Sequence, residues 1–235
     1  MNFAKAQKSY SENAIAQKEM AKKLFRVIGN FSQSPSRLFE IGSGTGFLTE
    51  RLMRMGTCEV ILNDINPNQT GFSDVTFLQG DICKIEIPQG LDLIASNAVF
   101  QWIDDLDALF SKLHSSLVKG GMLAFSTFGP QNYKQFNMQT PLNYHSLQDI
   151  ERMLIQNSFE ILHLEEELTT LYFQSPREVL EHIRATGVTT FSHSKHGLWT
   201  KETLEAFEEA YLAQNSDANG VELTYHPIYC VAKSI

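Results

Sequence analysis

The sequence is poor in cysteine, in long apolar runs and in basic charge, and each shortage excludes a class of protein. Its three cysteines are scattered and odd in number, which fits neither a disulfide framework nor a zinc site. No apolar run approaches the length of a membrane span, and the N-terminus has no apolar signal-peptide core. The net charge of −8 disfavours non-specific binding to nucleic acid. The sequence therefore predicts a cytoplasmic protein that contacts neither membrane nor nucleic acid.

What the chain does contain is an alternating pattern of strand and helix candidates. Helices are predicted at 47–55 and 105–118, between short apolar runs that read as strands. Such βα alternation indicates an α/β fold with a mostly parallel sheet and helices on both faces. The strand candidates before residue 128 are 38–41, 59–63, 76–79, 91–96 and 122–127.

The remaining chain is predicted to complete a single domain that spans residues 1–235. Residues 128–144 form a long polar loop, and 159–173 carry a long strand pattern. Ser146 and Ser175 are each followed three residues later by an acid, which predicts two helix starts. The predicted parts are an N-terminal helical cap at 1–30, a cofactor-binding core at 36–170, a helical insertion or lid at 174–220 and a final strand at 221–233.

A glycine-rich turn between the first strand and the first core helix carries the strongest functional signal. The stretch 40–46 reads Glu-Ile-Gly-Ser-Gly-Thr-Gly, and Phe47 stands where a dinucleotide-binding turn has its third glycine. Glycine lets a ligand approach the backbone closely. The acid Glu40 would repel a pyrophosphate but suits a cofactor with an ammonium group. The alternative is a purely structural strand-to-helix turn.

Two more strand ends carry acids in the order that a nucleoside ligand requires. Asp64 ends the second strand and is placed to accept the ribose hydroxyls, with Ile65 against one face of an adenine. Asp81 follows the third strand and is placed to accept from the adenine amino group, with Ile82 on the other face. A single Asp at a strand end is more often a turn former. Three acids at three successive strand ends favour a binding edge.

This pattern resembles the first motif of the S-adenosylmethionine (SAM) dependent methyltransferases of the Rossmann-like class. The resemblance implies a seven-stranded sheet and SAM as co-substrate. The fourth strand ends in Asn97-Ala98-Val99-Phe100 and has no proline pair, which argues against an amine or amide nucleophile. No carboxylate or His/Cys cluster suggests a metal-assisted site, so no metal is expected. The predicted cofactor-binding residues are Glu40, Gly42, Ser43, Gly44, Gly46, Asp64, Ile65, Asp81, Ile82 and Asn97.

A narrower resemblance covers residues 3 to 232. The chain resembles the malonyl-acyl-carrier protein O-methyltransferases of biotin synthesis in three segments, 96–102, 183–189 and 223–226, and in the spacing of Phe3, Tyr10 and Gln17. The resemblance implies methylation of the free carboxylate of a malonyl thioester, carried by acyl-carrier protein or by CoA. The methyl ester would prime pimeloyl synthesis. A carboxylate is already ionised at pH 7, so no general base is needed.

The resemblance also suggests five positioning residues, each of which has a structural alternative. Arg184 would bind the malonyl carboxylate, since a guanidinium suits that geometry. Tyr10 would offer its hydroxyl to substrate or to the SAM carboxylate, and Trp102 would wall the transfer pocket. Tyr225 and His226 are expected to alternate on a strand, so that one faces the core and the other the site. The alternatives are a surface Arg, a packing Tyr, a core Trp and an orienting or packing His.

The N-terminal lysines and Arg26 are the predicted docking residues for an acidic carrier protein, against the alternative of a solvated helix face. Two other functions stay open on the sequence. One is methylation of another small acid, such as an aconitate-like acid. The other is a catalytically silent SAM-binding protein.

Overall fold

The computed structural model describes residues 13–32, 34–56, 59–67, 70–136, 142–186 and 200–235, in two compact units. The large unit comprises residues 16–129, 143–167 and 227–235. The small unit comprises the described residues before 16 and those within 130–142 and 168–226. None of the helices in the described ranges combines the length and apolar character needed to cross a membrane.

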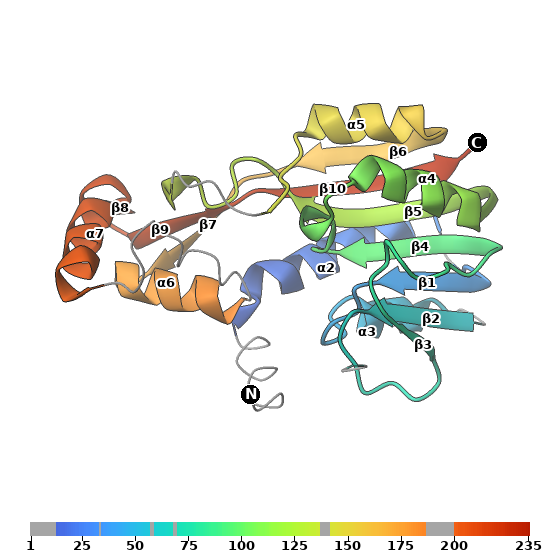
Figure 1. Cartoon of the computed structure of the whole chain (residues 1–235), viewed down its shortest axis with the longest axis horizontal. Coiled ribbons are helices and arrows are strands. Elements are labelled where there is room, and N and C mark those ends of the chain that lie inside the picture. The colour runs from blue at the N-terminus through green and yellow to red at the C-terminus, as the bar shows by residue number, and fades with distance from the viewer. Residues whose placement is uncertain (1–12, 33, 57–58, 68–69, 137–141, 187–199) are drawn as a thin grey trace. The chain divides into compact units, whose positions relative to one another are not determined.

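A seven-stranded sheet forms the large unit, in the order β3-β2-β1-β4-β5-β10-β6 (Figure 1). The first five strands in this order are mutually parallel, and β10 is antiparallel to both of its neighbours. The predicted Rossmann-like fold is confirmed. The strands are β1 (Arg37–Ile41), β2 (Glu59–Asp64), β3 (Thr76–Gln79), β4 (Leu91–Asn97), β5 (Leu117–Phe128), β6 (Phe159–Glu166) and β10 (Pro227–Ser234).

The strand order reverses between β1 and β4, and this reversal marks the candidate ligand site. The chain leaves β1 toward β2 on one side and reaches β5 from β4 on the other, so the two connections diverge. The carboxyl ends of strands at such a switch point border a crevice, which is the common ligand site of open α/β sheets. The glycine-rich turn follows β1 directly, and residues 98–102 follow β4.

Helices cover the sheet where the sequence provides caps and an apolar face. The large-unit helices are α2 (Ile15–Gly29), α3 (Thr49–Leu52), η1 (Met53–Met55), η2 (Phe100–Trp102), α4 (Leu106–Ser116) and α5 (Leu147–Gln156). The Ser146 side chain accepts the Asp149 N–H, so the predicted start of α5 is confirmed. The predicted helix 47–55 is shorter, because an α-helix of four residues passes into a 3-10 turn.

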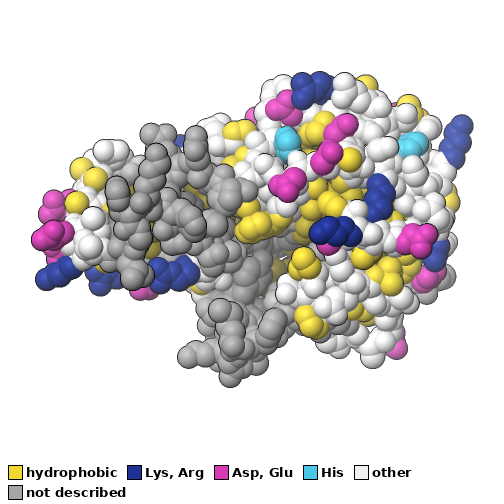
Figure 2. Space-filling model, viewed as in Figure 1, with side chains coloured by type: hydrophobic (Ala, Val, Ile, Leu, Met, Phe, Trp, Pro, Cys, Tyr) yellow, Lys and Arg dark blue, Asp and Glu magenta, His cyan; other side chains and the backbone are white. Residues whose placement is uncertain are grey.

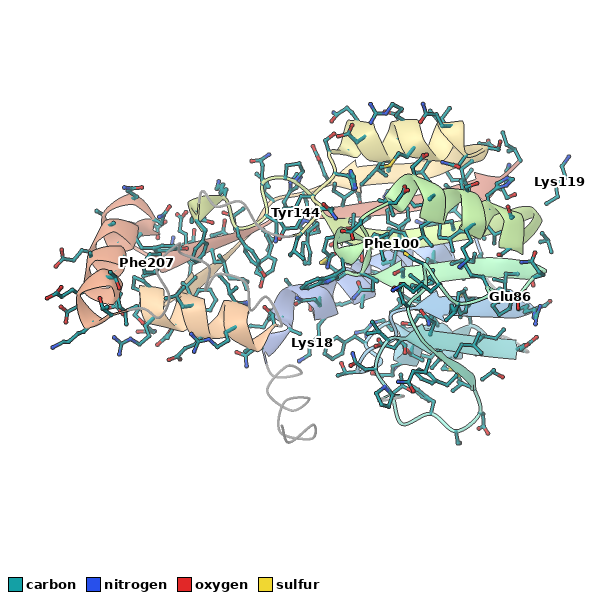
Figure 3. All side chains as sticks on the ribbon, viewed as in Figure 1. Lys18, Glu86, Phe100, Lys119, Tyr144 and Phe207 are labelled. Carbon is teal, nitrogen blue, oxygen red and sulfur yellow. The ribbon has the colours of Figure 1, made fainter. Side chains whose placement is uncertain are left out.

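Aromatic packing anchors the segment that follows β4. Phe100 lies 4.8 Å from Phe125 of β5 and 5.8 Å from Phe110 of α4, measured between ring centroids. All three rings are fully buried, and Figure 3 shows Phe100 between these elements. A buried Phe to Ala change typically costs about 3–5 kcal/mol, so this cluster holds η2 firmly against the core.

The small unit carries a three-stranded antiparallel sheet in the order β7-β9-β8 and two main helices. Its elements are η3 (Lys134–Phe136), β7 (Thr169–Phe173), α6 (Pro176–Ala185), α7 (Lys201–Gln214), β8 (Ser216–Asp217) and β9 (Gly220–Tyr225). Ser175 caps α6 through the Glu178 N–H, and Pro176 takes the first turn, as predicted.

Two predicted strands are wrong as single elements. The pattern at 159–173 is two strands, β6 and β7, in different sheets, and the pattern at 221–233 is likewise split into β9 and β10. Alternation has the same period in both sheets, so it does not reveal a change of sheet. His226 lies between β9 and β10 rather than inside a strand.

Candidate functional site

The glycine-rich turn has a backbone that favours glycine at three alternate positions. Gly42, Gly44 and Gly46 have φ values of 68°, 50° and 89°, a region that other residues rarely adopt. The Ser43 N–H donates to Asn63 O (2.9 Å), and the Gly44 N–H donates to Asp64 Oδ2 (2.9 Å). The end of β2 therefore fixes the turn that follows β1.

Gly42 is also required because its surroundings are full. A Cβ atom at Gly42 would lie 2.3 Å from Val99 Cγ2, which is far inside van der Waals contact. The turn after β1 and the turn after β4 thus touch, and Val99 occupies the space that any larger residue at 42 would need. The sequence motif gave no sign of this contact, because Val99 is remote along the chain.

Glu40 is the most unusual polar residue of the site. Its side chain is on β1 and only 1% of the residue is exposed. Burial raises the pKa of Glu40 to about 8, opposed by hydrogen bonding from Thr49 and assisted by the charge of Asp64. No group in the described part of the chain bonds Oε2 of Glu40. A buried carboxyl oxygen without a partner needs a donor, and the ammonium group of SAM fits that need.

A second buried acceptor was missed as a site residue at the level of sequence. Gln17 of α2 is 6% exposed, and within the described ranges its Oε1 has no hydrogen-bond partner. The main-chain oxygen of Gln17 accepts from Asn97 Nδ2 at the end of β4 (3.1 Å). The ammonium of Lys18, labelled in Figure 3, lies 5.3 Å from the centroid of the Phe47 ring just after the glycine turn. These contacts place Gln17 at the switch point, beside Asn97 at the end of β4.

The predicted cofactor residue Asn97 has its polar atoms engaged within the protein. Its Oδ1 accepts from the Ser126 hydroxyl (2.8 Å), while its Nδ2 holds α2 through Gln17. Asn97 therefore ties together β4, β5 and α2. Its expected direct contact with SAM stays a prediction, and the structure adds an anchoring role.

Asp64 and Ile65 lie at the end of β2, as predicted. Asp64 Oδ2 accepts from Gly44 N, and Oδ1 accepts from Asn66 N (2.8 Å). Ile65 is 67% exposed, which leaves an apolar surface beside this carboxylate. An exposed Ile next to an acid at a strand end is the arrangement that a nucleoside with ribose hydroxyls and a flat base requires.

The third predicted pair, Asp81 and Ile82, is arranged less favourably for a ligand. Asp81 accepts the Cys83 N–H (3.0 Å) and pairs with Lys84 (3.0 Å); these contacts, above all Lys84, hold the pKa of Asp81 below its usual value. Ile82 is 4% exposed and belongs to the hydrophobic core. Asp81 is thus a turn former in this structure, and Ile82 offers a ring little surface.

Trp102 lies on η2 and is 48% exposed. The alternative of a buried core Trp is therefore wrong. Figure 2 shows apolar side chains gathered on the visible face of the large unit. An exposed Trp on the switch-point edge of the sheet is available to a substrate.

The remaining substrate candidates belong to the small unit. Arg184 lies on α6 and is exposed. Tyr225 and His226 are both buried, so the expected division into one core and one site residue is not seen within this unit. The Tyr225 hydroxyl meets His182 Nε2 (2.7 Å), and His226 Nδ1 accepts from Gln131 N (3.1 Å). Tyr10 lies outside the described residues.

The buried group formed by His182, Tyr225 and Tyr133 holds a neutral histidine. Burial lowers the pKa of His182 to about 4, so its imidazole is neutral at pH 7. The Tyr133 hydroxyl donates to the Tyr225 hydroxyl at 3.3 Å, which extends the buried chain of polar groups. Such a satisfied network fixes β9 against α6 and the segment before η3. Among the described residues, no group of three or more His, Cys, Asp or Glu side chains is placed to hold a metal ion.

Comparison with known proteins identifies the family of the chain. Residues 39–125 match the family model described as Methyltransferase domain. The chain is 36% identical to the malonyl-acyl-carrier protein O-methyltransferase of Acinetobacter baylyi, over 98% of this chain and 94% of the relative. It is 35% identical to the protein of the same name from Bacteroides thetaiotaomicron, over 98% and 95%.

Two solved methyltransferase structures share the fold of this chain. A SAM-dependent methyltransferase from Mesorhizobium loti has a TM-score of 0.56 and 17% identity, covering 88% of this chain and 95% of its own. The N-methyltransferase NodS from Bradyrhizobium japonicum, in complex with S-adenosylhomocysteine (SAH), has a TM-score of 0.55 and 14% identity, covering 92% and 86%. The relatives from Acinetobacter baylyi and Bacteroides thetaiotaomicron match nearly the whole chain in both directions, and the protein therefore belongs to the malonyl-acyl-carrier protein O-methyltransferase family.

Proposed function

We propose that the protein transfers a methyl group from SAM to the free carboxylate of malonyl-acyl-carrier protein, in the cytoplasm, giving the ester that primes pimeloyl synthesis for biotin. The observation that carries this proposal is the name shared by relatives about 35% identical over almost the entire chain. The site supports it, because a buried carboxyl oxygen without a partner lies beside a glycine-rich turn at the switch point. Malonyl-CoA is the alternative carrier.

The residues of the large unit would hold the cofactor by its polar ends. Glu40 and Gln17 would take the ammonium group, and Asp64 the ribose hydroxyls, with Ile65 against the adenine. SAM supplies a methyl group whose carbon bonds to the carboxylate oxygen as its bond to sulfur breaks, and no proton is transferred. The chain therefore needs to align and partly desolvate an anion rather than activate it.

Mass spectrometry tests the function directly. Malonyl-acyl-carrier protein incubated with the protein and SAM should gain the mass of one methylene, and mild ester hydrolysis should remove it. Parallel reactions with malonyl-CoA and with a panel of small di- and tricarboxylic acids separate the carriers and the aconitate-like alternative. SAH binding by calorimetry on the same sample shows that the site is intact. Binding without any turnover would favour a silent SAM-binding protein.

Arg184→Ala should raise KM for malonyl-acyl-carrier protein about tenfold or more with a smaller change in kcat, because a charge-assisted pair with the carboxylate is lost. Arg177→Ala is a matched control, since Arg177 starts the same helix but pairs with Glu208 of α7 (3.1 Å). Arg184→Lys should recover only part of the loss, because an ammonium lacks the planar fork. Equal KM values in wild type and Arg184→Ala would remove Arg184 from the substrate site.

Docking of the carrier protein is assigned to fewer residues than the sequence predicted. Lys22 and Arg26 are exposed on α2. Lys23 is only 24% exposed at its side chain and is paired with two glutamates, so it is already used within the large unit. Lys5 and Lys8, which belong to the same predicted set, lie outside the described residues. We therefore base the docking proposal on Lys22 and Arg26.

A further inference from the structure

The chain takes a strained turn directly after β4. Ala98 has φ of 56°, a left-handed conformation that is uncommon for a residue with a side chain. Its N–H donates to Ser126 O of β5 (2.9 Å), so the strained residue is still held to the sheet. Strain of this kind persists only where the surrounding structure enforces it, and it concentrates at functional sites.

The side chain of Gln101 enforces this turn. Its Nε2 donates to Ala98 O at 2.7 Å, and its Oε1 accepts from the Thr127 hydroxyl at 3.1 Å. Gln101 is 3% exposed, so both bonds are shielded from water. Its main-chain oxygen also accepts from Asn143 N at 2.9 Å. One residue thus bridges the turn, the end of β5 and the segment leading to α5.

The clamped turn carries two side chains toward the cofactor edge of the sheet. Val99 lies inside the turn and fills the space over Gly42, which is the tight contact described above. Trp102 follows Gln101 directly and is half exposed. Phe100, between them, is fixed in the aromatic cluster of the core. Releasing the clamp would therefore move Val99 and Trp102 while Phe100 stays in place.

We propose that Gln101 is a positioning residue, which holds residues 98–102 in the strained geometry that sets Val99 against the glycine-rich turn and Trp102 at the substrate side. The proposal rests on the proposed methyl transfer for its kinetic consequence. Methyl transfer needs donor and acceptor aligned, so a small shift of this wall lowers the rate of transfer more than it lowers affinity. Gln101 itself touches neither ligand in this proposal.

A simpler role for Gln101 is that of a buried polar residue that only adds stability. The two roles differ in how they respond to glycine at position 98. Glycine adopts φ of 56° without strain, so Ala98→Gly should let the turn keep its shape without the clamp. A role limited to stability predicts that activity follows the melting temperature in every variant.

The test compares Gln101→Leu, Ala98→Gly and the double variant in kcat, KM and Tm. Gln101→Leu should lower kcat about tenfold or more while KM for SAM changes less, and the double variant should regain most of that loss. Gln89→Leu is the matched control. Gln89 also makes two side-chain bonds, to Ile87 O and Ser116 Oγ (both 3.2 Å), but it precedes the amino end of β4. It should keep wild-type kcat.

Tryptophan fluorescence reads the geometry without any turnover. Trp199→Phe leaves Trp102 as the one tryptophan of the sequence. In that background Gln101→Leu should change acrylamide quenching of Trp102, and adding Ala98→Gly should restore it. The proposal would be overturned if kcat fell in step with Tm and Ala98→Gly did not restore it. Unchanged quenching of Trp102 in Gln101→Leu would overturn it as well. If the wild type methylates nothing, the proposed function fails while the fluorescence result still decides the clamp.

Discussion

Glu40→Gln is expected to weaken SAH binding about 100-fold at pH 8, because a neutral amide no longer attracts the ligand's ammonium group through a charge-assisted bond. Glu40 is buried at the end of β1 with an oxygen that no described residue satisfies. Glu50→Gln is the matched control, since Glu50 is exposed and pairs with Arg54 (2.6 Å). Isothermal calorimetry measures both. A Glu40→Gln affinity within twofold of wild type would exclude the ammonium contact.

The same carboxyl should make binding depend on pH. Burial raises the pKa of Glu40 to about 8, so the free protein mostly holds this proton at pH 7 and must release it to face a cation. The ammonium group of SAH, a free amino acid, stays protonated through this range, so only the carboxyl changes its charge. Affinity should therefore rise with pH up to about pH 8 and fall on the acid side by up to about tenfold per pH unit.

Calorimetry in buffers of different ionisation enthalpy counts these protons. Wild type should release protons on binding SAH at pH 7, and Glu40→Gln should release none. The acid-side fall in affinity should vanish in the variant as well. Equal proton release by the two proteins would assign the pH dependence to another group.

Burial of Glu40 also predicts a cost in stability for the ligand-free protein. Between the ordinary glutamate pKa of 4.5 and the raised value of about 8, the folded protein holds a proton that the unfolded chain has lost. The free energy of unfolding therefore falls as pH rises through this window. Glu40→Gln removes the effect, so its Tm should exceed that of wild type at pH 8 and match it at pH 5. A lower Tm for the variant at pH 8 would contradict the raised pKa.

The position of the candidate cofactor residues was predictable because strand order converts sequence order into position, whereas their contacts with SAM stay a prediction. An acid at the end of each of three successive parallel strands must reach the same edge of the sheet, and Glu40, Asp64 and Asp81 do end there. The sequence does not reveal which of them has its polar atoms already used. Asp81 is occupied by Cys83 N and Lys84, and that pairing depends on the detailed path of the turn after β3.

Contacts between distant segments account for what the sequence missed. Val99 against Gly42 and Gln17 beside Asn97 join residues that no local pattern links. The Gln101-Trp102 pair was singled out by resemblance, but its physical role follows only from the left-handed Ala98 beside it. Charge patterning on α2 likewise identified Lys23 as a basic residue but could not show that Glu165 and Glu167 pair with it.

Lys23→Glu is expected to destabilise the protein strongly, whereas Lys22→Glu should have little effect. The Lys23 ammonium lies 3.0 Å from Glu165 and 2.6 Å from Glu167, and 4.5 Å from the centroid of the Tyr229 ring. The Tyr229 hydroxyl also donates to Glu167 (3.0 Å). Charge reversal would gather three carboxylates on a half-buried surface. Lys22 has a 53% exposed side chain and one exposed partner, Glu19.

The size of the effect follows from partial exposure. A fully buried pair that loses one partner costs about 3–5 kcal/mol and an exposed pair about 0–1, so Lys23→Glu should cost roughly 2–4 kcal/mol. For a chain of this length that corresponds to a fall in Tm of about 4–16 °C. Thermal melts of both variants at pH 7 make the comparison. An equal fall in Tm for Lys23→Glu and Lys22→Glu would show that the bonds of Lys23 to Glu165 and Glu167 contribute nothing to stability.

Acid should reduce the difference in Tm between Lys23→Met and wild type. Burial opposes the charged form of Glu165, but its bonds to Lys23 and His163 hold the pKa of Glu165 below 4.5. That stabilisation is present above pH 4.5 and is lost as pH falls through the lowered pKa. The Tm gap between Lys23→Met and wild type should therefore narrow from pH 7 to pH 3.5. A gap that stays constant would mean that the Lys23 ammonium stabilises the fold through the Tyr229 ring rather than through the two glutamates.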